Sequence, residues 1–509
     1  MLYPDYKEFK RKAEKGNLVP VYTEILADLD TPLSAFLKLR GRPSFLFESL
    51  EGGEKWARYS FIGSNPSLII EAEGRKLTVK RGKHRELIEA VKDPLEIVSA
   101  ELKKYRPVIV PGLPRFFGGF VGYIGYDTVR CFEDLPDYNH EGPGLPDIFL
   151  MLTDTLVVFD NITHKIKVIS NAHIEDAPGK AYEKAREKID GIVKKLRSRV
   201  PAPRRAGSSP DRPERAEAFK SNFSKKDFLR AVEKTKEYVK SGDVIQTVIS
   251  QNFERDTDIP PINAYRALRV INPSPYMYYI ETGKCTIAGS SPEILVRVEG
   301  DTIELRPIAG TRRRGKTPEE DMRMEQELRA DPKEIAEHIM LVDLGRNDAG
   351  RVAATGSVRV TELMSVERYS HVMHLVSNVV GRLGRRYDAF DVLRASFPAG
   401  TVTGAPKIRA MEIIEEIEPT RRGPYAGSVG YFDFSGNMDM CITIRTIIFR
   451  DKKAYIQAGA GIVADSDPLK EYKETVNKAK GMFRAIEMAE NELQGRTARR
   501  RSGEVDLCF

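Results

Sequence analysis

Runs of hydrophobic residues and the turns between them divide the chain into expected strands and helices. In the first half, short runs of β-forming residues predict antiparallel strands in SLIIEAEG, KLTVKRG and LVVFDNITHKIKVIS. In the second half, the strand-like runs are TVISQNFER, CTIAG, EILVRVEGDTIELRP, CITIRTIIF and AYIQAGAGIV, and the Gly-Asp step in the third predicts a hairpin. Apolar residues at helical spacing predict helices over about 181–196 and in SKKDFLRAVEKTKEYVKSG, which ends at Gly242.

Strands and helices mix along the chain without a regular β-α alternation, and hairpins are frequent. We therefore predict an α+β fold in which large antiparallel β-sheets pack as a sandwich, with helices on the outer faces and two intimately associated regions. The segment VPAPRRAGSSPDRPERAEAF has no apolar periodicity and predicts a linker. The expected division is an N-terminal region at 1–199, a linker at 200–222, a second region at 223–490 and a charged tail at 491–509.

Length and composition restrict the class of protein. A chain of 509 residues is too long for one ordinary core, and its 41% hydrophobic and 30% charged residues are typical of a globular protein. No apolar run approaches the roughly 18 residues that cross a bilayer, and the polar start MLYPDYKEFKRKAEKG predicts no secretory signal. Four widely spaced cysteines favour a reducing cytoplasm over disulfides or a zinc site; they are Cys131, Cys285, Cys441 and Cys508.

The net charge of +7 comes from 81 basic and 74 acidic residues, and the basic residues cluster only locally, as at 312–314 and 499–501. A nucleic-acid-binding protein concentrates such an excess on one face. We interpret the charge as solvated surface, and predict no nucleic-acid partner. Locally, it could attract a small dianionic substrate.

Two helix starts carry paired carboxylates. DPKEIAEHIMLVDL places Glu334 and Glu337 three residues apart, and SDPLKEYKETVNKAK places Glu471 and Glu474 three apart, with Lys478 one turn later. Four carboxylates would make an oxygen-rich site that suits Mg²⁺ if the two helices met. For either helix alone, a solvated acidic face is the simpler interpretation, and the sequence leaves the meeting of the helices open.

Glycine-rich segments form a second group of candidates. They are AGT at 309–311, SFPAGTVTGAPK, YAGSVG and QAGAGIVADS. Glycine serves where a backbone turns with positive φ or approaches a ligand closely, so each is either a tight turn or an anion site. GTVTGAPK lacks the spacing of a phosphate loop, and nucleotide binding is not indicated.

Longer segments resemble the chorismate-utilising enzymes and, within that family, component I, the large subunit, of anthranilate synthases. The segments that carry the resemblance are SPEILVRVEGDTIELRPIAGTRRRG, DPKEIAEHIMLVDLGRNDAGRV, VERYSHVMHLVSNVVG, FPAGTVTGAPKIRAMEIIEEIEP and QAGAGIVADS. It covers nearly all of 223–490, which it implies is a chorismate-binding catalytic domain, and extends more loosely into FLFESLEGGEKWARYSFIG.

The resemblance implies a set of site residues. The two acidic helices would converge on Mg²⁺, with Glu337 and Glu474 as ligands and Glu334 and Glu471 behind them. The implied catalytic residues are His374, near the departing 4-hydroxyl of the substrate, and Thr401. The implied substrate-binding residues are Gly310, Thr311, Tyr425, Arg445, Gly459, Ala460, Gly461 and Lys478. The roles suit the chemistry, because a guanidinium grips a carboxylate in two places and glycine backbones offer N–H donors.

Two further histidines have no such assignment. His371 is interpreted as a structural or surface histidine. His338 is left open, either as structural or as a support for Glu337.

The implied reaction adds ammonia at C2 of chorismate, expels the 4-hydroxyl and eliminates pyruvate to give anthranilate, the first step of tryptophan biosynthesis. Relatives that make aminodeoxychorismate commonly carry a nucleophilic lysine at the position of Ala309. Isochorismate- and salicylate-forming relatives carry a water-activating lysine at the position of Gln246. Both residues favour direct attack by ammonia. Aminodeoxychorismate synthesis for folate stays open as an alternative, because some of those enzymes also lack the lysine. A non-catalytic amino-acid-binding regulator is disfavoured by the intact site residues.

Regulation and an ammonia source are implied as well. FLFES and NPSPYM resemble the two halves of a tryptophan feedback site, in which Glu48 and Ser49 would meet the polar end of the amino acid. Pro275, Tyr276 and Met277 would line the pocket, although FLFES could also be the core face of a strand. Since no cysteine lies in a glycine-flanked elbow, we expect a separate glutamine amidotransferase subunit, component II, to deliver ammonia within a heterotetramer.

Overall fold

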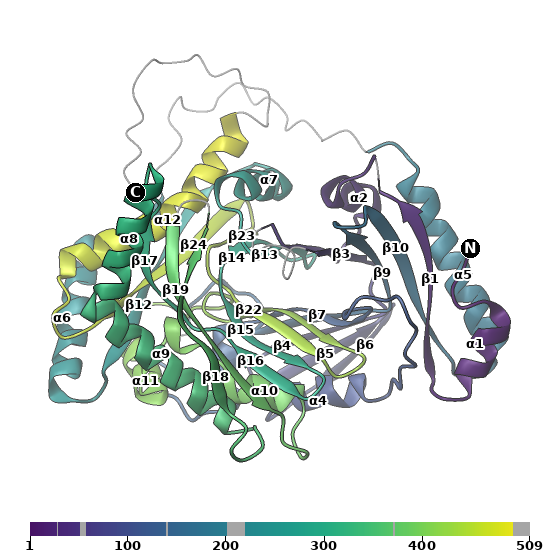
Figure 1. Ribbon diagram of the computed structural model, residues 1–509, viewed down its shortest axis with the longest axis horizontal. Helices are drawn as coiled ribbons and strands as arrows, with labels where there is room; N and C mark the ends of the chain where they lie inside the picture. The colour runs from purple at the N-terminus through teal and green to yellow at the C-terminus, as the bar shows by residue number, and fades with distance from the viewer. Residues whose placement is uncertain (28, 51–57, 139–140, 201–218, 370–371, 492–509) are drawn as a thin grey trace.

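The computed structural model describes residues 1–27, 29–50, 58–138, 141–200, 219–369 and 372–491. In this part of the chain, two large antiparallel sheets lie one above the other, and helices cover their outer sides (Figure 1). One continuous set of buried apolar side chains reaches strands of both sheets. The predicted α+β class with large antiparallel sheets is confirmed.

The first sheet contains 12 described strands. In spatial order they are β1 (Leu18–Leu26), β10 (Lys165–His173), β9 (Thr155–Asp160), β3 (Tyr59–Ser64), β2 (Ser44–Glu48), β13 (Tyr276–Glu281), β14 (Thr286–Ser291), β23 (Thr446–Arg450), β24 (Lys453–Ile462), β12 (Gln246–Asp256) and β11 (Lys220–Ser221), with β20 (Gly404–Ala405) beside β12. Chain segments from before and after the expected linker meet where β2 pairs with β13.

The second sheet has the same composite build. In spatial order its described strands are β17 (Ile308–Arg313), β19 (Val372–Arg382), β16 (Thr302–Leu305), β15 (Ile294–Glu299), β22 (Met438–Ile442), β21 (Ser428–Asp433), β7 (Gly119–Ile124), β8 (Ile148–Thr153), β4 (Leu68–Glu73), β5 (Lys76–Arg81) and β6 (His84–Ile88), with β18 (Arg359–Arg368) beside β19. Here early and late segments meet where β21 pairs with β7. Every position of β7 and β8 is buried, as expected for central strands covered on both faces.

Helices contact the strands from outside. On the first sheet they are α1 (Tyr6–Ala13), α2 (Pro32–Leu39), α5 (Pro178–Leu196), α6 (Lys225–Ser241), α7 (Pro261–Ile271), α11 (Lys407–Ile417) and α12 (Pro468–Asn491). On the second sheet they are α8 (Pro318–Ala330), α9 (Pro332–Gly350) and α10 (Ala389–Ser396), with α4 (Pro94–Leu102) packed on α10. Two 3-10 turns, η1 (Tyr126–Cys131) and η2 (Gly400–Val402), complete the described elements. Figure 1 shows α6, α9, α11 and α12 gathered at one end, on the left, and α1 and α5 at the other.

Local signals set several boundaries, among them the predicted helix end at Gly242 and the predicted hairpin. The side chain of Asp331 caps the start of α9 by accepting hydrogen bonds from backbone N–H groups of its first turn. Gly242 ends α6 in the left-handed conformation, at φ 85°. The hairpin joins β15 and β16 through Gly300, at φ 59°. No described helix combines the length and the apolar character needed to cross a membrane.

The segment CITIRTIIF, expected as one strand, is divided between the two sheets. β22 ends at Ile442 in the second sheet, and β23 begins at Thr446 in the first. The chain bends between them at Arg445, whose φ of 51° is unusual for a residue with a side chain. The apolar pattern did not indicate the break, because both halves are buried strands.

A second crossing lies beside the first. The chain also changes sheets between β14 and β15, and the strands remain paired before and after the change, β14 with β23 and β15 with β22. At the crossing, the backbone N–H of Ser290 donates to the carbonyl of Arg445 (3.1 Å), and that of Ile442 donates to the carbonyl of Glu293 (3.0 Å). The crossings therefore place Glu293 and Arg445 at the same corner of the two sheets.

The close approach of β2 and β3 gives a test of the packing. A Cβ atom added at Gly63 would lie 2.2 Å from the ring of Phe45. We expect Gly63→Ala to lower the free energy of unfolding by about 1–3 kcal/mol through overpacking. Gly191→Ala is the control, because no atom lies within 4 Å of its added Cβ. In helix α5 this change should stabilise by up to about 1 kcal/mol. Equal effects of the two variants in chemical denaturation would contradict this account of the packing.

Candidate active site

Arg445 presents a partly buried positive charge at the corner where the chain changes sheets. No carboxylate among the described residues forms an ion pair with its guanidinium, and burial lowers its pKa. An arginine stays charged even so, because its ordinary pKa is above about 12. A desolvated cation without a counter-ion is a strong attractor for an anionic ligand.

Glu293 occupies the neighbouring crossing and was not assigned from the sequence. Its residue is 9% exposed, and burial raises the pKa of its carboxyl to about 8, against smaller lowering effects of the Thr401 hydroxyl and the Lys478 charge. At neutral pH the group is therefore mostly protonated and can donate a proton. The available signal was a glutamate directly before the apolar run ILV, where a buried strand begins.

His374, on β19, has the opposite character. Its Nδ1 lies 2.9 Å from the carbonyl oxygen of Gly310 and 3.1 Å from Oγ1 of Thr311. Since a carbonyl only accepts, Nδ1 carries the hydrogen and Nε2 has the free electron pair. Burial lowers the pKa of His374, the charge of Arg445 lowers it further, and the Gly310 hydrogen bond raises it. His374 is thus a neutral imidazole whose Nε2 can accept a proton.

The predicted glycines 459 and 461 lie inside strand β24 instead of a loop. A Cβ at Gly459 would lie 2.9 Å from the hydroxyl oxygen of Tyr425, and a Cβ at Gly461 would lie 2.5 Å from Nε2 of Gln246. The missing side chains leave room for these two polar groups. Nζ of Lys478 donates to the carbonyl of Gly459 at 3.0 Å, which brings the third turn of α12 to the same place.

Ala460 and Thr401 complete this wall. The methyl group of Ala460 belongs to the apolar cluster under α6, so only its backbone can face a ligand. Thr401 lies in η2, which contacts α9 and β24. Its Oγ1 is buried and has no hydrogen-bond partner within 3.5 Å among the described residues, although the hydroxyl is near enough to Glu293 to lower the pKa of that carboxyl.

The carboxylates of α9 and α12 interact across the two helices. Burial raises the pKa of Glu337, the charges of Glu334 and Glu474 raise it further, and Lys478 lowers it. Burial likewise raises the pKa of Glu471, and Lys333 of α9 is among the groups that lower it. The acidic faces of the two helices therefore point toward each other, which the sequence had left open.

Two of these four carboxylates already have a cation beside them. Glu334 pairs with Arg312 at 2.9 Å, and Glu474 pairs with Lys478 at 2.7 Å. In the part of the chain that the structure describes, no three side chains of the metal-binding types lie close enough together to hold an ion. The donors have the chemistry that Mg²⁺ prefers, but two of the four carboxylates are paired with Arg312 and Lys478.

Other candidates turn out to be structural. His338 is fully buried, its Nε2 lies 2.6 Å from Oγ of Ser377, and burial lowers its pKa to about 4. It faces β19 and does not support Glu337 through that nitrogen. Lys407, in the phosphate-loop-like segment, pairs with Asp348 at 2.9 Å. His371 lies outside the described residues.

The three described cysteines are free thiols without activation. Burial raises the pKa of Cys131 and of Cys285 to about 11, and raises that of Cys441 further. A thiol becomes a nucleophile when its pKa is lowered, so none of the three is prepared for covalent chemistry. Cys508 lies outside the described residues.

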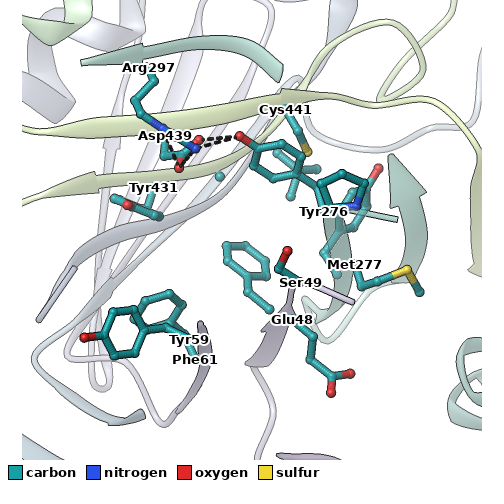
Figure 2. Close-up of a pocket in the computed structure, with 15 residues that line it drawn as sticks. Glu48, Ser49, Tyr59, Phe61, Tyr276, Met277, Arg297, Tyr431, Asp439 and Cys441 are labelled. Carbon is teal, nitrogen blue, oxygen red and sulfur yellow. Dashed lines mark hydrogen bonds and ion pairs between the residues drawn. The ribbon is translucent and has the colours of Figure 1, made fainter. Parts of the chain in front are cut away.

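A separate cavity of about 600 Å³, including its open mouth, lies between the sheets (Figure 2). The pairing of β2 with β13 sets Met277 opposite Glu48 and so brings the two predicted halves together. All five predicted residues line it, namely Glu48, Ser49, Pro275, Tyr276 and Met277. Residues without a sequence signal complete the wall, chiefly Tyr59, Phe61, Arg297, Tyr431, Asp439 and Cys441. They come from strands that only the tertiary fold brings near.

One wall of the cavity is polar and tightly bonded. The hydroxyl of Tyr276 donates to Oδ1 of Asp439 at 3.0 Å, and Arg297 donates to both, at 3.0 Å to Tyr276 and 2.8–3.0 Å to Asp439. This network ties β13 of one sheet to β15 and β22 of the other.

Glu48 contributes to the wall but not through its carboxylate. Figure 2 shows that group pointing away from Ser49 and Tyr276. It accepts a hydrogen bond from Tyr265 (2.6 Å) and pairs with Arg269 (3.0 Å), both on α7. The carboxylate that we expected at the polar end of a ligand is therefore used to hold α7.

Comparison with known proteins fits this geometry. The family model for chorismate binding enzyme matches residues 42–484. Component 1 of anthranilate synthase from Aquifex aeolicus is 52% identical over 95% of this chain and 98% of its own length, and that from Acetivibrio thermocellus is 50% identical over 96% and 99%. The crystal structure of anthranilate synthase component I from Streptococcus pneumoniae superposes with a TM-score of 0.75, at 38% identity over 90% of this chain and 98% of that one.

The buried carboxyl of Glu293 should make stability depend on pH. Between its ordinary value of 4.5 and its folded pKa of about 8, the folded state keeps a proton that the unfolded state has released. Stability contributed by this group is thus present below about pH 4.5 and is lost as pH rises toward 8. Glu293→Gln should therefore gain stability relative to the parent chain as pH rises, by at most on the order of 5 kcal/mol.

Thermal unfolding at about pH 5 and about pH 9 measures this difference. Glu299→Gln, at the exposed end of β15, the strand that follows Glu293, is the control and should show no such trend. A constant difference between Glu293→Gln and the parent at both pH values would show that Glu293 is ionised in the folded state.

Proposed function

The chain belongs to the family of chorismate binding enzymes, and from that premise we propose that it converts chorismate and ammonia into anthranilate and pyruvate, the first step of tryptophan biosynthesis. The observation that carries the proposal is the similarity to component 1 of anthranilate synthase along almost the whole of both chains. Ala309, which is buried in β17 and offers no amine, supports ammonia over an enzyme-borne nucleophile.

The geometry supports binding of a dianion at the corner of the sheets. The guanidinium of Arg445 would hold one carboxylate in two places, and the ammonium of Lys478 adds a second positive charge. The absence of side chains at Gly459 and Gly461 lets Tyr425 and Gln246 lie against β24, and the ring would bind beside Tyr425. Burial keeps the hydroxyl of Tyr425 protonated, because it raises the pKa, so that hydroxyl can donate to the substrate.

Two groups of the candidate site, Glu293 and His374, then have the protonation states that the reaction needs. As ammonia forms a bond to C2, the double bonds shift and the C4–O bond breaks, and protonated Glu293 gives its proton so that the 4-hydroxyl leaves as water. In the second step Nε2 of His374 takes the proton from C2. The C3–O bond breaks, the ring becomes aromatic, and the released enolpyruvate takes up a proton to become pyruvate. This gives His374 the role of a base, and Glu293 the position near the 4-hydroxyl.

Mg²⁺ is the cofactor that we propose, held by Glu337 and Glu474 with Glu334 and Glu471 behind them. When bound, it would withdraw charge from the ring carboxylate and orient the substrate. The mutual repulsion and burial that raise the pKa of Glu337 support a cation between these helices. For Glu474 to serve as a ligand, Lys478 must release it, and that lysine would then be available to the substrate.

We also propose that ammonia comes from a separate glutamine amidotransferase subunit, in the cytoplasm. The three described cysteines support this division, because burial leaves them as unreactive thiols. Glutamine hydrolysis needs an activated cysteine.

The purified chain tests the proposal directly. With chorismate, Mg²⁺ and ammonium it should form anthranilate, seen by fluorescence, together with an equal amount of pyruvate. Chelation of the metal should abolish the reaction, and glutamine should not replace ammonium. An aminated product that retains the pyruvyl group would assign the chain to aminodeoxychorismate synthesis, the alternative that Ala309 disfavours.

The cavity between the sheets is proposed to bind tryptophan as a feedback inhibitor. Its aromatic walls suit a ligand with an indole ring. The polar end would be met by Ser49 and by backbone groups of the 274–277 segment. The Glu48 carboxylate would act indirectly, by fixing α7.

Adding bulk at Ser49 should separate inhibition from catalysis. Ser49→Leu places an apolar side chain in the cavity, and we expect the inhibition constant of tryptophan to rise about tenfold or more, equivalent to about 1.4 kcal/mol. Ammonia-dependent turnover without tryptophan should stay within about twofold of the parent. Ser67→Leu, an exposed serine before β4, is the matched control and should leave inhibition unchanged. Unaltered inhibition of Ser49→Leu would place the inhibitor elsewhere.

A further inference from the structure

Arg422 is almost completely withdrawn from solvent, at 2% exposure, and it lies between α11 and Tyr425. Its guanidinium forms a two-point ion pair with Glu418, Nε to Oε2 at 2.9 Å and Nη2 to Oε1 at 2.6 Å. Nη1 also donates to the carbonyl of Val402 (2.7 Å), and Nη2 to the carbonyl of Val248 (2.8 Å). Arg422 is therefore almost fully buried and makes four polar contacts.

Each of these contacts ends on a segment that carries a site residue. Val402 ends the turn η2 and directly follows Thr401. Val248 lies two residues after Gln246 and pairs with Gly461 across β12 and β24.

The guanidinium also lies 5.6 Å from the ring centre of Tyr425, within the range of a cation–π contact. The turn η2, the strand β12 and the ring of Tyr425 therefore all contact the side chain of Arg422.

The partner Glu418 extends the same connection. Its Oε1 accepts hydrogen bonds from both the backbone N–H (2.7 Å) and the hydroxyl (2.8 Å) of Ser250, on β12. The ion pair is thus bonded to β12 at Val248 and at Ser250, and to η2 at Val402. Both charges are buried and already bonded to protein groups, so neither faces a substrate.

Stability alone is a poor reason for such a pair. Burying two charges costs about as much as their attraction returns, and apolar replacements of a buried pair are often as stable. The pair does fix the relative positions of the groups bonded to it, because the N–H groups of a planar guanidinium point in defined directions. The position of Thr401 depends on such neighbouring bonds, because its own buried hydroxyl has no hydrogen-bond partner within 3.5 Å among the described residues.

We propose that Arg422, held by Glu418, is a positioning residue for the reaction: it sets Thr401, the start of β12 and the ring of Tyr425 relative to one another, and through Thr401 it fixes the surroundings of the proton donor Glu293. The inference rests on the proposed function, in which Glu293 protonates the leaving hydroxyl. Arg422 itself does not touch the substrate.

Arg422→Lys tests the proposal. Lysine keeps a charge opposite Glu418, but its single ammonium cannot hold the carboxylate and both carbonyls in their present places. We expect kcat to fall about ten- to a hundredfold, as small misplacements of reacting groups do, with a much smaller change in the KM for chorismate. The pH profile of kcat should also shift, because the surroundings of Glu293 change. Rates are referred to the folded fraction, measured by circular dichroism.

Arg130→Lys is the matched control. Arg130 also pairs with a glutamate of α11, Glu415, but its other strong bond goes to the carbonyl of Pro136, which belongs to no wall of the site. This variant should lose stability to a similar degree and keep the parent kcat and pH profile. The same losses in both variants would overturn the proposal and leave Arg422 with a structural role.

A double variant, Arg422→Met with Glu418→Leu, keeps the test decisive if the lysine variant fails to fold. It removes both charges together, which commonly preserves stability. A folded double variant should be slow, with a shifted pH profile; one with the parent rate and profile would refute the proposal. Loss of chorismate is followed beside anthranilate formation. If the parent makes another product, the proposed function fails, and the same comparison on that product still decides the role of Arg422.

Discussion

The paired crossing of the chain between the two sheets is the constraint on which the rest of the structure depends. Two antiparallel strand pairs, β14–β23 and β15–β22, are continuous through it, so a single ribbon belongs to both sheets. The hydrogen bonds from Ser290 to Arg445 and from Ile442 to Glu293 close this ribbon where the strand ladders are interrupted. Because backbone groups at a buried crossing must be satisfied by each other, its geometry is closely fixed. The sheets, their shared core and the corner that holds the charged groups all follow from it.

The same burial gives the corner its chemistry. Removing a carboxyl from water favours its neutral form, and removing an imidazole from water does the same. Glu293 therefore keeps a proton while His374 lacks one, although in water at neutral pH the carboxyl would be ionised. The surroundings of the two side chains, and not their residue types alone, thus make one an acid and the other a base, which is a common arrangement in enzymes. Arg445 adds charge to this place and pushes His374 further toward the neutral form.

The cavity and the corner share structural elements. Strand β22 lines the cavity with Asp439 and Cys441 and then leads, within four residues, to Arg445. Tyr278 borders the cavity on β13, and its hydroxyl lies 2.6 Å from Oγ1 of Thr446, next to Arg445. The cavity and the corner therefore lie on one continuous ribbon of paired strands.

The sequence alone determined the class of fold, some of the helices and strands, such as α5, α6, β12 and the β15–β16 hairpin, and the residue types of the candidate site, because periodicity and capping signals act over a few neighbours. The caps at Asp331 and Gly242 and the hairpin at Gly300 are of this kind. The resemblance to a family then named a substrate and many positions. Only the tertiary structure decided that CITIRTIIF breaks at Arg445, that Glu293 is buried enough to hold a proton, and that the Glu48 carboxylate turns toward α7. These facts depend on which distant segments exclude water from a side chain, and a linear pattern of hydrophobic and polar residues does not carry that information.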